Sequence, residues 1–131
     1  MRSFQMPVFL IAAMVLTIPA YAQGGLQVVR PIPGYVCLAL NLNEQQMFSL
    51  ASRVPILESP APTAKPIGYA SATVIASTVP PTNGFQQVLK LDAVPGWIST
   101  SYLKPWKNLG GNGHRCIPSL MSNGRLGFGF E

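Results

Sequence analysis

The sequence predicts one small domain that is mainly β. The chain has 131 residues, of which 48% are hydrophobic and only 10% charged, a length that fits a single domain. From Ala51 onward, short β-branched or aliphatic runs alternate with clusters of Pro, Gly and Asn, at spacings typical of an all-β protein. We found no internal repeat that would favour another architecture.

Residues 1–22 are predicted to be a secretory signal peptide. Arg2 gives a positive start, residues 8–18 are an unbroken apolar run, and the small residues Ala20 and Ala22 suit cleavage by a signal peptidase. No later segment offers the roughly 20 apolar residues that a membrane-spanning helix needs. We therefore expect a periplasmic or secreted protein whose mature chain has no membrane span.

The distribution of the basic residues along the chain argues against a nucleic-acid partner. Of 9 basic residues, loss of Arg2 leaves 8, which against 4 acidic residues gives a formal charge of +4. These positive residues are spread through the chain, whereas nucleic-acid sites gather them into a patch. A weak attraction to acidic cell-wall polymers or lipid headgroups stays open. The oligomeric state is not indicated.

Residues 23–50 are expected to form an N-terminal arm. Pro31 and Pro33 disfavour a helix at its start, so this part is predicted to be extended. Further on, Asn43 is placed to cap a short helical turn over residues 44–47, and an acidic residue at the first position suits the helix dipole.

The segment 51–106 is expected to contain the strands, and Ser59–Pro66 (SPAPTAKP) is expected to be a loop. Residues 99–103 are compatible with one helical turn. Residues 107–131, which are rich in Gly and Asn and lack periodicity, are predicted to be a tail. The strands are predicted at residues 53–57, 67–77, 85–91 and 96–99.

Two cysteines, Cys37 and Cys116, form an even pair in a chain predicted to be exported, so a disulfide is expected. The loop that it closes, 116 − 37 = 79 positions, corresponds to about 4–5 kcal/mol in the chain-entropy model. The alternative is a cysteine nucleophile served by His114. That alternative requires a reduced thiol and a third group to orient the histidine.

In chain order, four sets of residues resemble a bacterial SH3-like domain. The matching segments are Val54–Leu57 before the proline-rich loop, Gly68–Ala70 leading into Thr73–Ile75, Gly84–Phe85 with Val88, and Gly96–Ile98 followed by Leu103–Pro105. The resemblance implies a small five-stranded SH3-like barrel over residues 51–106. It also implies that the disulfide joins the N- and C-terminal arms, and that Phe85 and Trp97 are core residues.

Catalytic and metal sites are not expected. The mature chain has one histidine, and its carboxylates are too far apart in sequence to share one element. There is no Gly-x-Ser-x-Gly motif, and one histidine with two oxidised cysteines cannot complete a zinc site. The carboxylates are Glu44, Glu58, Asp92 and Glu131. No cofactor is expected either.

The candidate ligand-binding residues are aromatic and basic. Tyr102 and Trp106 lie four residues apart, with Lys104 and Lys107 beside them, and Tyr69 is a further aromatic candidate that could belong either to a surface groove or to the core. We expect a non-catalytic periplasmic binding or adaptor module that contacts peptidoglycan or an envelope protein. The alternative is a structural accessory subunit or inhibitor of a periplasmic enzyme, with the barrel as scaffold.

Overall fold

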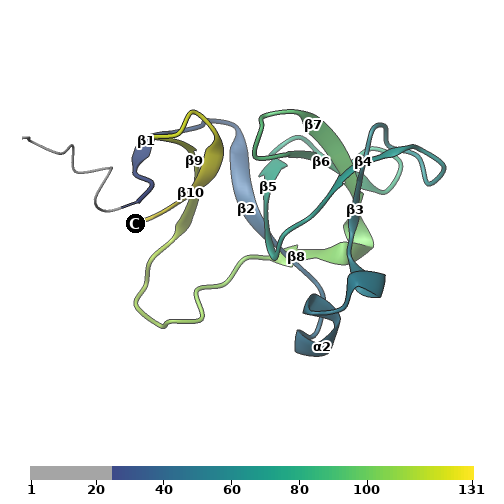
Figure 1. Ribbon diagram of the computed structural model, residues 1–131, viewed down its shortest axis with the longest axis horizontal. Coiled ribbons are helices and arrows are strands. Elements are labelled where there is room, and N and C mark those ends of the chain that lie inside the picture. The colour runs from purple at the N-terminus through teal and green to yellow at the C-terminus, as the bar shows by residue number, and fades with distance from the viewer. Residues whose placement is uncertain (1–24) are drawn as a thin grey trace, which may run out of the picture.

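The structure is a computed structural model that describes residues 25–131, so the predicted signal peptide lies outside the described residues. The prediction of a mainly β protein is confirmed. The strands form two antiparallel sheets that lie next to each other in Figure 1. None of the helices formed by residues 25–131 is long and apolar enough to cross a membrane.

The larger sheet has seven strands and the smaller sheet has three. In spatial order the larger sheet contains β4 (Pro66–Tyr69), β3 (Pro55–Leu57), β7 (Pro95–Ser99), β6 (Phe85–Leu89), β5 (Thr73–Ser77), β2 (Tyr35–Leu40) and β8 (Leu103–Pro105). The smaller sheet contains β1 (Val28–Pro31), β9 (Cys116–Met121) and β10 (Leu126–Phe130).

The expected five-stranded barrel is wrong, because a strand from the predicted N-terminal arm lies inside the larger sheet. β2 pairs with β5, where Cys37 is opposite Ile75, and with β8, where Leu40 is opposite Leu103. The prolines and the glycine just before β2 led to the prediction of an extended arm. Cys37 and Leu40 of β2 are nevertheless buried within the sheet.

The predicted C-terminal tail is also corrected, since β9 and β10 form a hairpin and β1 pairs with β9. The glycines in β10 are packing positions rather than signs of a tail. A Cβ atom at Gly127 would lie 2.7 Å from Met121 Cγ, and one at Gly129 would lie 3.1 Å from Val28 Cγ2. Larger residues would therefore push neighbouring strands apart.

The helical prediction at residues 44–47 is confirmed as α2 (Glu44–Met47). The Asn43 side chain accepts a hydrogen bond from the Gln46 backbone N–H, and the Gln46 side chain accepts one from the Asn43 backbone N–H. This reciprocal pair is a capping box. Two further single turns follow, η1 (Leu50–Ser52) and η2 (Thr100–Tyr102), the latter within the predicted turn at 99–103.

The predicted long strand over residues 67–77 is divided into β4 and β5 by a break at residues 70–72. The other predicted strands appear with shifted ends, and the predicted loop over 59–66 connects β3 to β4. Because the break turns the chain, β4 pairs with β3 at one end of the sheet while β5 lies near the other end.

The core lies on one face of the seven-stranded sheet. It is formed by Leu40, Val54, Ile56, Val74, Ala76, Val88 and Ile98. Phe85 is buried, as expected, but Trp97 is only half-buried and does not belong to this cluster. Successive side chains of a strand point to opposite faces, so burial of Ile98 in the core places Trp97 on the other face.

Part of the other face, at β2, β5 and β6, lies next to the smaller sheet. Ile75, which is fully buried, lines the space between the sheets together with Leu89 and Phe128. The expected disulfide joins the sheets, because Cys37 of β2 is bonded to Cys116 at the start of β9, with Cα atoms 6.0 Å apart.

Candidate functional site

Three of the five candidate residues line one hollow on the surface. Lys104, Trp106 and Lys107 lie along β8 and the segment after it, at the edge of the seven-stranded sheet. The hollow has a volume of about 530 Å³. Its other walls come from Ala39, Leu40, Leu42, Met47, Ala72, Thr73, Pro105 and Leu109.

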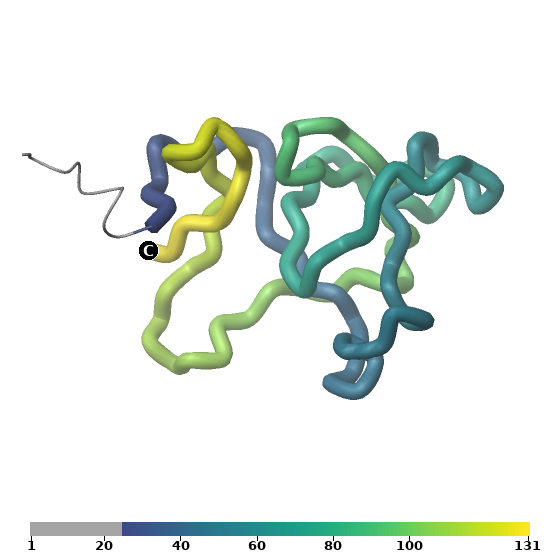
Figure 2. Tube along the Cα trace, viewed as in Figure 1, coloured from purple at the N-terminus to yellow at the C-terminus, as the bar shows by residue number. Residues whose placement is uncertain are grey.

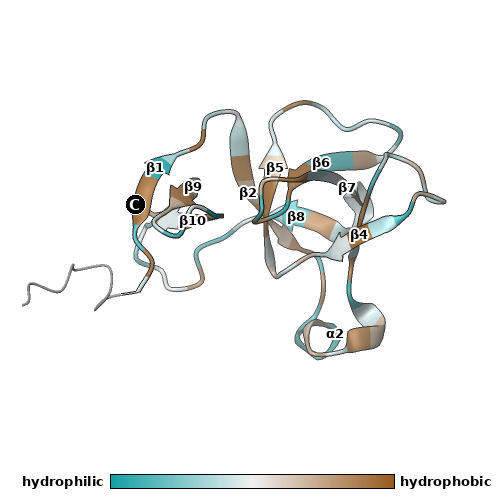
Figure 3. Ribbon diagram, turned by 45° about the horizontal axis from the view of Figure 1, so that its top comes forward, coloured by the Kyte–Doolittle hydropathy of each residue, from teal (hydrophilic) through white to brown (hydrophobic). Residues whose placement is uncertain are grey.

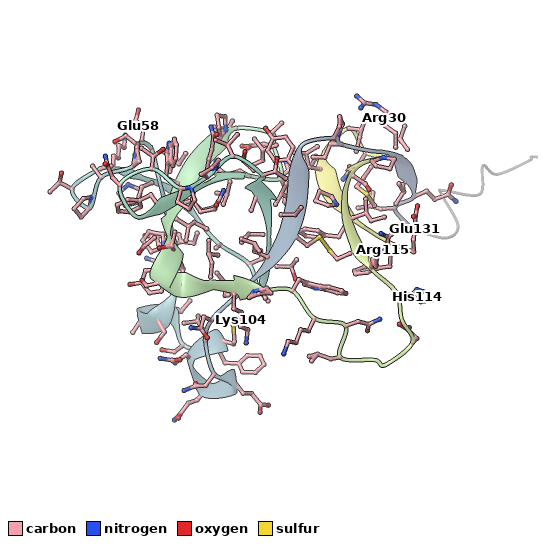
Figure 4. The ribbon with its side chains drawn as sticks, turned by 180° about the vertical axis from the view of Figure 1, so that it is seen from behind. Arg30, Glu58, Lys104, His114, Arg115 and Glu131 are labelled. Carbon is pink, nitrogen blue, oxygen red and sulfur yellow. A yellow bond between two sulfur atoms is a disulfide. The ribbon has the colours of Figure 1, made fainter. Side chains whose placement is uncertain are left out.

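The hollow forms because three segments that are distant in sequence meet at this edge. β2 and β8 are paired, which brings Ala39 opposite Lys104. The capped turn α2 follows β2 closely and supplies Met47, and the loop before β5 supplies Ala72. Figure 4 shows Lys104 on the same side of β8 as α2. The site is therefore mostly apolar, with two cations.

A second, smaller hollow of about 200 Å³ adjoins α2, since Gln46 and Met47 line it. It shares Leu40, Leu42, Met47 and Ala72 with the first hollow. Phe48, which also lines it, is 85% exposed to solvent. The two hollows and the apolar side chains around α2 thus form one continuous surface region.

Tyr102 and Tyr69 do not line the larger hollow. Tyr102 precedes β8, and its backbone carbonyl accepts a hydrogen bond from the Asn41 N–H, while its side chain is 41% exposed. Tyr69 ends β4, where the Arg53 guanidinium lies 3.8 Å from its ring centroid. This cation–π contact engages one face of the Tyr69 ring. The predicted residues therefore do not form a single site.

Trp106 also connects the hollow to the smaller sheet. Its ring centroid lies 6.0 Å from that of Phe130 in β10, with the planes tilted by 35°. Trp106 also lines a third hollow of about 390 Å³, together with Tyr35, His114 and Arg115. Figure 4 shows His114 and Arg115 on this part of the molecule. Trp106 is half-buried, so it has both a structural contact and an accessible part.

The proposed alternative of a cysteine nucleophile is overturned, because Cys37 and Cys116 are both in the disulfide. Among the described residues, no group of three or more His, Cys, Asp or Glu side chains is arranged to hold a metal ion. The pKa of the Asp92 carboxyl is lowered, chiefly by the hydrogen bond from the Val94 backbone N–H and also by Lys90. Asp92 is remote from the larger hollow, whose lining does not include it.

Sequence reasoning missed the apolar side chains that border the hollows. Phe48 and Leu50 follow the capped turn, and Leu109 lies in the Gly- and Asn-rich segment. A signal was present for Leu109, which is an isolated large apolar residue among glycine and asparagine. Only the fold places Met47 and Leu109 on the same hollow.

Comparisons with protein-family models, curated proteins and solved structures found no match. The resemblance to SH3-like domains therefore stays a prediction from the sequence. The functional argument depends on the surface of this chain alone.

Proposed function

We propose that this protein is an exported, non-catalytic binding module that contacts peptidoglycan or an envelope protein through the larger hollow. The observation that carries the proposal is the convergence of Lys104, Trp106 and Lys107 on one apolar hollow. The disulfide is compatible with an oxidising compartment such as the periplasm.

The lining of the hollow favours an envelope protein over a glycan. Aliphatic walls such as Leu40, Leu42 and Met47 suit an apolar side chain of a partner, and Trp106 is the one aromatic ring among the described lining residues on which a sugar could stack. The two lysines at the hollow suit a carboxylate beside that apolar group. Stem peptides of peptidoglycan also carry carboxylates, so peptidoglycan is the second outcome that the experiment must distinguish.

Site-specific cross-linking in cells tests the proposal. A photo-reactive side chain would replace Lys107, and the matched control would replace Lys65, which is exposed in the loop before β4. We expect a discrete protein adduct from position 107 and none from position 65. Binding to peptidoglycan is measured by sedimentation with the purified polymer. The wild type is compared with the Lys104→Glu/Lys107→Glu variant.

Equal adducts from both positions, together with no sedimentation, would contradict a ligand site at the hollow. Stoichiometric co-purification with a periplasmic enzyme whose activity the protein changes would favour the alternative, an accessory subunit or inhibitor.

A further inference from the structure

We infer that one edge of the molecule docks on the surface of an anionic lipid membrane. This edge, named the apolar–basic edge, consists of residues 47–50 and 104–109. The inference goes beyond the proposed function, because it concerns side chains that project into solvent at the rim of the hollow rather than a ligand held inside it.

Three large apolar side chains of this edge are almost fully exposed. Phe48, Leu50 and Leu109 have exposed fractions of 85%, 83% and 97%, the highest among the large hydrophobic residues of the described chain. Residues that project in this way gain nothing from the protein core. Removal of such surface from water, for example into a membrane, would be favourable.

The exposed residues lie on two segments that project from the same side of the molecule. Figures 1 and 2 show α2 and the connection between β8 and β9 extending on this side of the sheets. In Figure 3 part of the chain around α2 is coloured as hydrophobic. The segments border one space, because Met47 and Leu109 line the same hollow. Their tips can therefore meet a single surface.

A bilayer interface fits separate protrusions better than a folded partner does. A rigid protein would need preformed cavities matched to Phe48 and Leu50 on one segment and to Leu109 on the other. The boundary between headgroups and acyl chains accepts apolar side chains at any position, because it is fluid.

The charge on the edge selects the type of lipid. Lys104 and Lys107 line the hollow between the projecting segments. Residues 47–50 and 104–109 contain no carboxylate, and Glu44 at the first position of α2 precedes the edge. Negatively charged headgroups would attract these cations, each of which strengthens binding about fivefold. A ligand in the hollow would then lie at headgroup level, where the membrane-proximal segment of an envelope protein lies.

Vesicle sedimentation tests the inference. The full chain would be isolated from the exported fraction, and its mass determined, so that all variants share one N-terminus. Vesicles would contain either phosphatidylcholine alone or equal parts of phosphatidylcholine and phosphatidylglycerol. The test variants are Phe48→Ser/Leu109→Ser and Lys104→Gln/Lys107→Gln. The matched controls are Val79→Ser, a 62% exposed apolar residue outside the edge, and Lys65→Gln.

We expect the wild type to bind anionic vesicles more tightly than neutral ones. The apolar double variant should bind about tenfold more weakly or worse, and the lysine double variant about 25-fold more weakly on anionic vesicles. Both controls should match the wild type. Thermal midpoints should be unchanged in every variant, because the substituted side chains are exposed.

Absence of wild-type binding to anionic vesicles overturns the inference, and so does unchanged binding by the apolar double variant. If vesicle binding is absent but a specific protein adduct still forms at position 107, membrane docking is excluded. The proposed function would then remain supported.

Discussion

The rings of Trp106 and Phe130 lie 6.0 Å apart and connect the end of the seven-stranded sheet to the last strand of the three-stranded sheet. This contact and the disulfide both join the two sheets. Because Trp106 makes the ring contact and also lines the hollow, a substitution of Trp106 should affect both the stability of the protein and the binding of a ligand in the hollow.

A double-mutant cycle with Trp106→Ala and Phe130→Ala measures the ring contact. We expect a coupling free energy of about 0.5–1.5 kcal/mol, as for other aromatic pairs. Urea unfolding of the four proteins gives this value. Additive effects would show that the rings do not stabilise each other.

Loss of the disulfide should lower stability strongly. The Cys37→Ser/Cys116→Ser variant frees a loop with a sequence separation of 79 residues. The chain-entropy model gives an expected loss of about 4–5 kcal/mol, because the unfolded chain gains freedom. The measurement is the free energy of unfolding in urea without reductant. An unchanged midpoint would mean that the sheets are held together without the bridge.

Substitution of Ile98 should destabilise the protein more than substitution of Trp97. Ile98 is fully buried in the core, so Ile98→Ala should cost about 2–5 kcal/mol. Trp97 is half-buried on the opposite face, so Trp97→Ala should cost less despite its larger side chain. Thermal melts of both variants decide the order, and the reverse order would place Trp97 in the core.

Gly96 should tolerate no side chain. A Cβ atom there would clash with Ile56 Cγ2 and lie 3.1 Å from the Leu57 carbonyl oxygen, which is backbone and cannot move aside. We expect Gly96→Ala to cost about 1–3 kcal/mol through overpacking. Gly110→Ala, in the connection between β8 and β9, is the matched control and should have little effect. Comparable losses in the two variants would argue against close packing at Gly96.

The Asp92 carboxyl should titrate at a lower pH than an ordinary aspartate, because its pKa is lowered. The hydrogen bond from the Val94 N–H, at 3.0 Å, and nearby Lys90 favour the charged carboxylate. Since the folded-state pKa is lowered, the contribution of Asp92 to stability is present above its unfolded pKa. It is lost as the pH falls through its folded pKa. NMR titration of the carboxyl carbons measures this difference, and Asp92→Asn should remove the associated acid dependence.

The sequence alone predicted the short helix, the disulfide and the strand positions between residues 53 and 99. Asn43 and Gln46 form a capping box within four residues, so the short helix could be predicted from sequence alone. The disulfide followed from two cysteines in a chain expected to be exported. The strand positions between residues 53 and 99 followed from short β-branched runs between turn residues, because these depend on nearby residues.

The pairing of strands was decided only by the tertiary structure. Periodicity does not show that β2 lies between β5 and β8, or that β10 pairs with β9, because apolar burial depends on partners far along the chain. The choice of Ile98 over Trp97 for the core depends on which face of β7 the sheet buries. The candidate site depends on the same long-range packing, since Met47 and Leu109 meet only when β2 and β8 pair beside α2.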